Sequence, residues 1–128
     1  MYRAVGLLRP DTDFTLDEAE ARLRSQFPNF TLTREADQIV VSDGSWWIAL
    51  ALRSGADVST ETQGLVERLA GVEPQEADAL IASGRRVEVW TDIPDPFMEH
   101  FNDYLKMVEV LKSFAGLLAV DPKEPGVL

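Results

Sequence analysis

Hydrophobic residues alternate with polar ones in several short stretches of the chain, and this pattern predicts β-strands. Over residues 30–34, Phe30 and Leu32 fall on one side while Thr31 and Thr33 fall on the other. A period of two is typical of a strand with one buried face. With similar short apolar runs included, strands are predicted at residues 2–9, 30–34, 39–41, 46–52, 86–91 and 117–120.

A β-hairpin is predicted where an Asp-Gly pair, residues 43–44, separates two of these runs. A two-residue turn at this place pairs Val41 with Trp46. It also puts Val40 opposite Trp47 on the other face of the sheet, because successive side chains of a strand point to opposite faces.

Apolar residues spaced three or four positions apart predict helices. Thr15 and Glu18 form a capping box at the start of the first one. Asp95 and Pro96 are typical first residues of the last and longest helix, in which Phe97 begins the stripe expected to face the core. The helices are predicted at residues 16–27, 57–71, 74–83 and 95–114.

The order of these elements favours an α+β fold, because strands dominate the middle of the chain and helices are few. We expect a two-layer sandwich, in which a mostly antiparallel sheet of about five to six strands carries helices on one face. A ferredoxin-like core is compatible with this order. The chain is interpreted as a single domain over residues 1–128, with residues 121–128 as a tail.

The net charge of the chain limits the classes of partner that it can bind. Twelve Lys and Arg face 22 Asp and Glu among the 128 residues, so the formal net charge is −10 with the single His neutral. This charge repels nucleic acids and anionic membranes and favours a basic protein partner. The apolar run at residues 4–8 is too short for a signal-peptide core, so we expect a cytoplasmic protein.

The residues available for catalysis are few. The chain has no Cys, which excludes disulfides and thiolate ligands. His100 is the only imidazole, with Glu99 and Asp103 within one helical turn, but no Ser stands in a Gly-x-Ser-x-Gly context. A solvated helix face is the simpler interpretation of these three residues. We predict no cofactor and no metal site, and an enzyme that uses His100 with carboxylates is the weakest hypothesis.

Acidic residues are concentrated between residues 90 and 104, where the sequence has four carboxylates and no Lys or Arg, a formal charge of −4. Phe97 and Met98 interleave with these acids. The predicted partner-binding residues are Asp92, Asp95, Glu99, Asp103, Trp90 and Ile93. The leading hypothesis is a non-enzymatic acidic interaction protein, such as an inhibitor or immunity-type protein, that binds a basic protein. The alternative is that the acids only complement a helix dipole.

A second candidate surface is the face of the sheet that the helices leave open. Its predicted ligand-binding residues are Val40, Trp47, Ala49 and Trp90, joined on the first strand by Ala4 and Gly6. Small residues beside large aromatic ones predict a shallow apolar hollow, which a ligand or a second copy of the chain would cover. The alternative hypothesis is therefore a small-molecule-binding or homodimeric α+β domain, unless the last helix or the tail covers this face.

Overall fold

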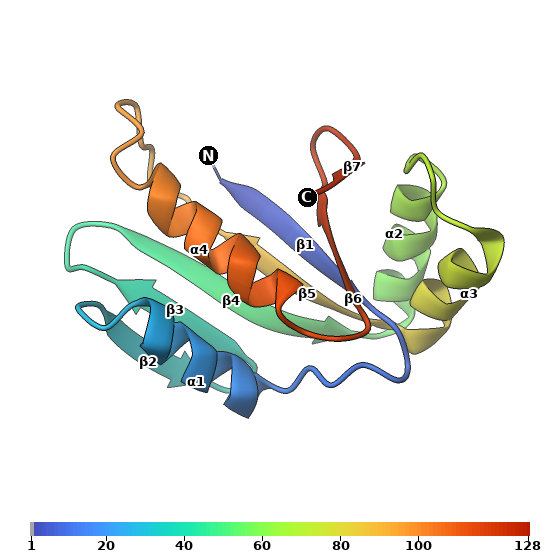
Figure 1. Ribbon diagram of the computed structural model, residues 1–128, viewed down its shortest axis with the longest axis horizontal. Helices are drawn as coiled ribbons and strands as arrows, with labels where there is room; N and C mark the ends of the chain where they lie inside the picture. The colour runs from blue at the N-terminus through green and yellow to red at the C-terminus, as the bar shows by residue number, and fades with distance from the viewer. Residues whose placement is uncertain (1) are drawn as a thin grey trace.

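The computed structural model describes residues 2–128, which form a seven-stranded antiparallel sheet and four helices (Figure 1). The strand order across the sheet is β2-β3-β4-β5-β1-β6-β7. The strands are β1 (Arg3–Leu8), β2 (Thr31–Glu35), β3 (Gln38–Ser42), β4 (Trp47–Ser54), β5 (Arg85–Trp90), β6 (Leu117–Asp121) and β7 (Gly126–Val127). The helices are α1 (Leu16–Gln26), α2 (Ala56–Val66), α3 (Pro74–Ser83) and α4 (Phe101–Lys112). Within residues 2–128, no helix is long and apolar enough to cross a membrane.

The predicted α+β class is confirmed, with an antiparallel sheet on which helices pack. The ferredoxin-like core stays a prediction. The sheet has seven strands, more than the expected five to six, because residues 121–128 do not form a simple tail. There, β7 pairs with β6 so that Val127 lies opposite Val120. Asp121 accepts the backbone N–H of Lys123 at 2.8 Å and thereby shapes the turn between the two strands.

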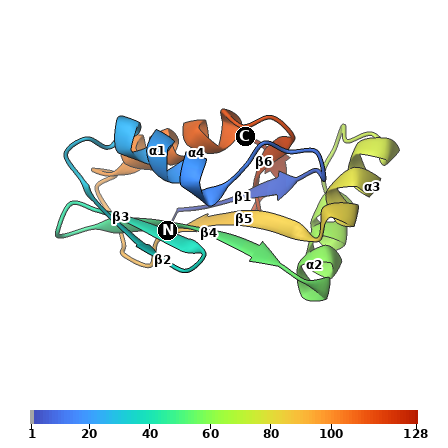
Figure 2. The ribbon, with the colours of Figure 1, turned by 90° about the horizontal axis from the view of Figure 1, so that it is seen from below.

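The main hydrophobic core lies between the sheet and the helices α1 and α4, which cover the same face (Figure 2). Leu23 of α1 and Met107 and Leu111 of α4 are fully buried in it. From the sheet, Ile48 and Leu50 of β4 belong to the same cluster. Burying such side chains supplies most of the favourable free energy of folding, so α4 is firmly seated on the sheet.

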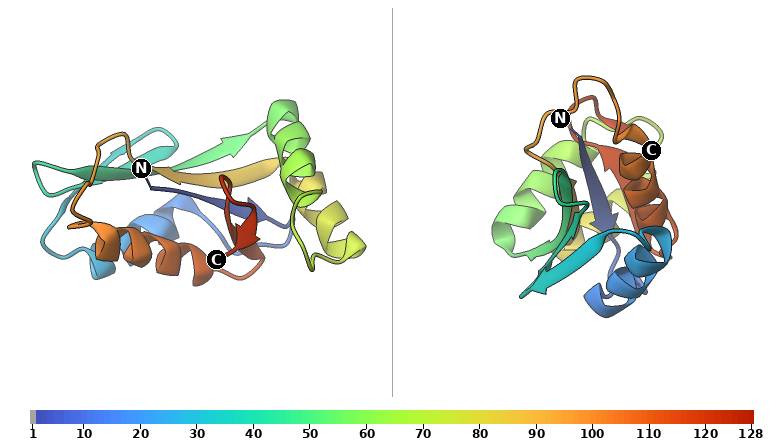
Figure 3. Two further views of the ribbon diagram at one scale, coloured as in Figure 1. Left: turned by 90° about the horizontal axis from the view of Figure 1, so that it is seen from above. Right: turned by 90° about the vertical axis from the view of Figure 1, so that its left-hand side faces the viewer.

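A second, smaller core lies on the opposite face, where α2 and α3 cover one end of the sheet (Figure 3). Val5 and Leu7 of β1 pack there with Leu65 of α2 and Leu80 of α3. Helices therefore lie on both faces, whereas the sequence predicted them on one. Because α2 and α3 cover only one end, the part of this face around Trp90 carries no helix of the described chain.

The β3–β4 hairpin is formed with a different register from the predicted one. Val41 lies opposite Ile48 instead of Trp46, and Val40 lies opposite Ala49. The turn is wider than two residues because the Asp43 carboxylate accepts the backbone N–H groups of residues 45 and 46. A slip by two residues keeps every side chain on its face.

Of the residues predicted to lie on the open face, those on the hairpin do share one face. Those on β1, Ala4 and Gly6, lie on the other face. Ala49 lies opposite Trp90, in line with the prediction. Ala4 and Gly6 lie opposite Val89 and Val87 on the α1–α4 face. Their assignment to the open face was wrong because β1 pairs with β5 so that Arg3, and not Ala4, stands beside Trp90.

Candidate docking surface at the loop between β5 and α4

The loop of residues 91–100, called the docking loop below, joins β5 to α4. It projects beyond the first turn of α4 (Figure 1). A helix was predicted to start at Asp95, but α4 begins only at Phe101. Pro94 and Pro96 disfavour the helical conformation of the residues before them. Met98 then takes a left-handed conformation with φ 55°, which no regular helix contains.

Asp95 ties the docking loop to the N-terminal end of β1. Its Oδ2 accepts the hydroxyl of Tyr2 at 2.6 Å and the backbone N–H of His100 at 2.9 Å, and its Oδ1 accepts the N–H of Glu99 at 3.0 Å. Burial opposes ionisation of this carboxyl, but the hydrogen bonds from Tyr2, His100 and Glu99 outweigh it and lower the pKa of Asp95. Burial and then the bond to Asp95 raise the pKa of Tyr2 to about 12.

His100 ties the docking loop to two further elements. Its ring stacks on the indole of Trp46, with centroids 4.3 Å apart and planes 2° from parallel. Nδ1 lies 3.0 Å from Oδ2 of Asp103 in α4, and Nε2 lies 3.8 Å from Oδ2 of Asp43 in the β3–β4 turn. Hydrogen bonds from the N–H groups of residues 45 and 46 lower the pKa of Asp43. The enzyme hypothesis based on His100 stays a prediction.

Two large apolar side chains at the tip of the docking loop face solvent. Phe97 is 84% exposed and Met98 is 59% exposed. Phe97 was predicted to begin the core stripe of the last helix, and this was wrong, because the loop turns it away from the sheet. Two adjacent large apolar residues that are mostly exposed are unusual on a folded surface and are typical of an interaction site.

The acidic surroundings of Phe97 and Met98 are not neutralised. Five carboxylates belong to the docking loop or contact His100, namely Asp43, Asp92, Asp95, Glu99 and Asp103. In residues 2–128, none of the five has a Lys or Arg nitrogen within 4.0 Å. Asp92 and Glu99 are exposed and present their charge to a partner directly, whereas Asp43 and Asp95 accept backbone hydrogen bonds and Asp103 contacts His100.

The predicted partner-binding residues do not all lie together. Glu99 is exposed on the docking loop, while Asp95 and Asp103 are half-buried beneath it. Ile93 packs against the main core. Trp90 and Asp92 line a hollow on the open face of the sheet. Sequence reasoning placed Phe97 in the core and therefore missed it as an exposed anchor, although the two prolines beside it argue against a helix there.

Acid should loosen the docking loop by protonating Asp95. Because the pKa of Asp95 is lowered in the folded protein, its hydrogen bonds contribute stability above about pH 4, and this contribution is lost as the pH falls through the folded value. We expect the amide protection of Glu99 and His100 to fall in that range, measured by hydrogen exchange with the buried strand residue Leu50 as internal reference. In Asp95→Asn, protection at pH 7 should already be reduced, and protection equal to wild type would contradict the role given to Asp95.

No family model matches this chain, and searches of curated proteins and of solved structures returned no similar protein. In residues 2–128, no group of three or more His, Asp or Glu side chains is placed to hold a metal ion. The arrangement of Phe97, Met98 and the surrounding carboxylates is therefore the feature from which a function can be argued.

Proposed function

We propose that this protein is a cytoplasmic, non-enzymatic interaction protein that binds a basic protein through the docking loop. One observation carries the proposal: Phe97 and Met98 are 84% and 59% exposed in a loop that also carries Asp92, Asp95 and Glu99, and no Lys or Arg nitrogen of residues 2–128 lies within 4.0 Å of these three carboxylates. An acidic inhibitor or immunity-type protein, which would cover a cationic surface of its target, fits the size and the net charge of −10.

The apolar and acidic groups have separate tasks in such a complex. A buried aromatic anchor contributes about 2 kcal/mol or more to binding when it fills a pocket of the partner. The carboxylates act over a Debye length of about 8 Å at physiological salt and mainly raise the rate of association. The proposed partner therefore has an apolar pocket with Lys or Arg around it.

The loop is also held in a defined conformation before any partner arrives. Asp95 bonds it to Tyr2, and His100 fixes it to Trp46 and Asp103. A surface that is ordered in advance loses less conformational entropy on binding. This favours the docking loop over a mobile segment as the recognition element.

The charge contribution can be tested without disturbing the loop. Asp92 and Glu99 are exposed, and neither side chain has a hydrogen bond or ion pair in the described part of the chain. Asp95 is left unchanged because it holds the loop. The partner is first captured from extract of the native cell on the immobilised protein and purified. Asp92→Lys/Glu99→Lys should then slow its association about 10-fold or more at low salt, as measured by stopped flow.

The matched control is Asp78→Lys/Glu67→Lys, which changes the net charge equally at exposed positions near α3. This helix lies at the end of the molecule remote from the docking loop (Figure 1). The association rates of the two variants should differ at 50 mM salt and converge at 500 mM, since salt screens the electrostatic field of the carboxylates. Equal association rates at low salt, or a captured partner with net negative charge, would overturn the proposal.

A further inference from the structure

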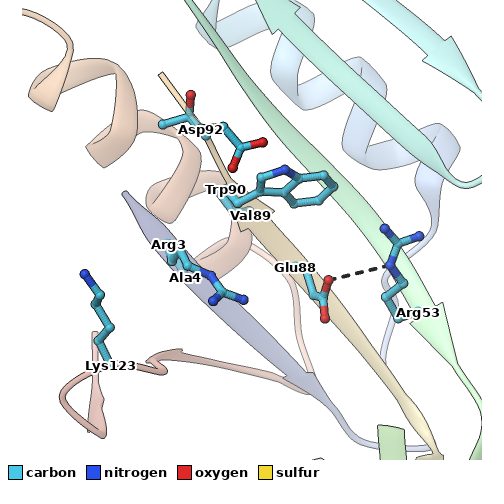
Figure 4. A pocket seen from close by; sticks show the side chains of 9 residues that line it. Arg3, Ala4, Arg53, Glu88, Val89, Trp90, Asp92 and Lys123 are labelled. Atoms are coloured by element: carbon cyan, nitrogen blue, oxygen red, sulfur yellow. Dashed lines mark ion pairs between the residues drawn. The ribbon is translucent and has the colours of Figure 1, made fainter. Parts of the chain in front are cut away.

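The open face of the sheet contains a hollow of about 480 Å³ that is separate from the docking loop tip (Figure 4). Its lining comes from strands and connecting segments and includes no helix residue, and its charged and aromatic members are Arg3, Arg53, Glu88, Trp90, Asp92 and Lys123. Trp90 is the aromatic residue of this lining, and its indole is half-buried. The volume falls in the range of small-molecule sites, about 300 to 1,000 Å³.

The charge of the hollow is opposite to that of the whole chain. Three cations line it, Arg3, Arg53 and Lys123, against the two carboxylates of Glu88 and Asp92. The hollow thus has a formal charge of +1 in a chain whose net charge is −10. Such a concentration of cations at one concave place attracts an anion, because a cleft focuses the field of the charges around it.

Two of the three cations are not occupied by the protein's own acids. Arg53 pairs with Glu88 at 3.5 Å, as the dashed line in Figure 4 shows. In residues 2–128, neither Arg3 nor Lys123 has a carboxylate oxygen within 4.0 Å. Arg3 is available even though Glu88 and Asp92 line the same hollow. Each of the two free cations can therefore pair with an acid group supplied from outside, although in Figure 4 the guanidinium of Arg3 points towards Glu88 and Lys123 lies on the other side of β1.

The third feature is the flat apolar surface of Trp90. The guanidinium of Arg53 lies over part of this ring, 5.8 Å from its centre, and Ala49, opposite Trp90 on β4, is fully buried beside it. A planar ring can stack on an indole, whereas a free inorganic anion gains nothing from one. Guanidinium groups bind carboxylates and phosphates with strong, charge-assisted hydrogen bonds.

We propose that this hollow binds a small organic anion with a planar ring, whose acid group is attracted by the free cations Arg3 and Lys123 and whose ring packs against Trp90. The acid group is a carboxylate or a phosphate. This site goes beyond the proposed protein docking, because it uses the open sheet face and neither Phe97 nor Met98; Thr91 and Asp92, at the start of the docking loop, also belong to its lining.

To test this, the full chain is titrated separately with 1-naphthoate, 1-naphthyl phosphate and inorganic phosphate. Binding is monitored through the indole and amide signals in ¹H–¹⁵N spectra. At least one naphthyl compound should shift the Trp90 indole signal saturably, with a Kd of about 1 mM or tighter. The tighter of the two identifies the acid group. Absence of a saturable shift with both compounds would overturn the proposal, and an equal response to inorganic phosphate would overturn the role of Trp90.

Matched variants locate the site. Arg3→Glu/Lys123→Glu should weaken binding of the naphthyl compound at least 10-fold. Arg24→Glu/Lys112→Glu changes the net charge equally on α1 and α4, on the other side of the sheet, and should bind like wild type. Equal weakening in both variants would overturn the site. Phe97→Ser should also bind like wild type, so a failure here is distinguishable from a failure of the docking proposal.

Discussion

Replacing Phe97 and Met98 together by serine should abolish partner binding while the fold stays intact. The two side chains are 84% and 59% exposed, so they contribute little to the core, and surface substitutions of this kind change stability by about 0.5 kcal/mol or less. In a complex they would be the buried anchor. Their removal should cost about 3 kcal/mol of binding free energy, which is a loss of more than about 100-fold in Kd, measured by calorimetry with the purified partner.

The control for this variant is Val127→Ser in β7. Val127 is 56% exposed and lies on the edge strand at one side of the sheet. It should retain wild-type affinity, because it is not part of the docking loop. Wild-type affinity in the Phe97/Met98 variant, or an equal loss in Val127→Ser, would show that the partner uses another surface.

The largest effect on stability is expected from Leu111→Ala in α4. Leu111 has no exposed surface and packs in the main core. Truncation removes buried methyl groups and leaves a cavity, which typically costs about 2 to 5 kcal/mol. Urea unfolding should show this loss as a large drop in the transition midpoint, since the total free energy of unfolding of a small domain is only about 5 to 15 kcal/mol.

Leu105→Ala on the same helix is the comparison, because Leu105 is 39% exposed. It removes the same atoms from a position that faces partly into water, and it should cost less than about 1 kcal/mol. Similar losses for the two variants would mean that α4 is not seated on the sheet through the face that carries Leu111.

The parts of the fold that depend on neighbouring residues could be predicted from the sequence. The backbone N–H of Glu18 donates to the Thr15 hydroxyl at 3.1 Å, which is one half of the predicted capping box, and the Glu18 side chain pairs with Arg22 instead of making the other half. The alternation in the strands, which is also a local pattern, grouped Val40 and Ala49 on one face. The hairpin register was missed because it depends on hydrogen bonds that the Asp43 carboxylate accepts from the backbone N–H groups of residues 45 and 46.

The start of α4 and the exposure of Phe97 depend on distant residues. Phe97 and Phe101 are four positions apart, and this spacing fits a buried helical stripe as well as a loop followed by a helix. One contact that favours the loop is the hydrogen bond that the Tyr2 hydroxyl donates to Asp95, across 93 positions of the sequence. No local pattern contains that contact.

The open face was predicted only in part for the same reason. Its residues on β4 and β5 follow from alternation, but Arg3 reaches the hollow through the β1–β5 register. Lys123 reaches it through the turn that joins β7 to the sheet. The sequence suggested an apolar hollow around Trp90, whereas long-range pairing gives it a cationic rim.

The central claim is that the docking loop is the surface at which a basic protein binds. Hydrogen–deuterium exchange of the whole chain, alone and with the captured partner, tests it most directly. Exchange should slow at residues 91–100 and at the first turn of α4, and remain unchanged at α3. Slower exchange confined to α2, α3 or the edge strand β2, with the docking loop unaffected, would contradict it.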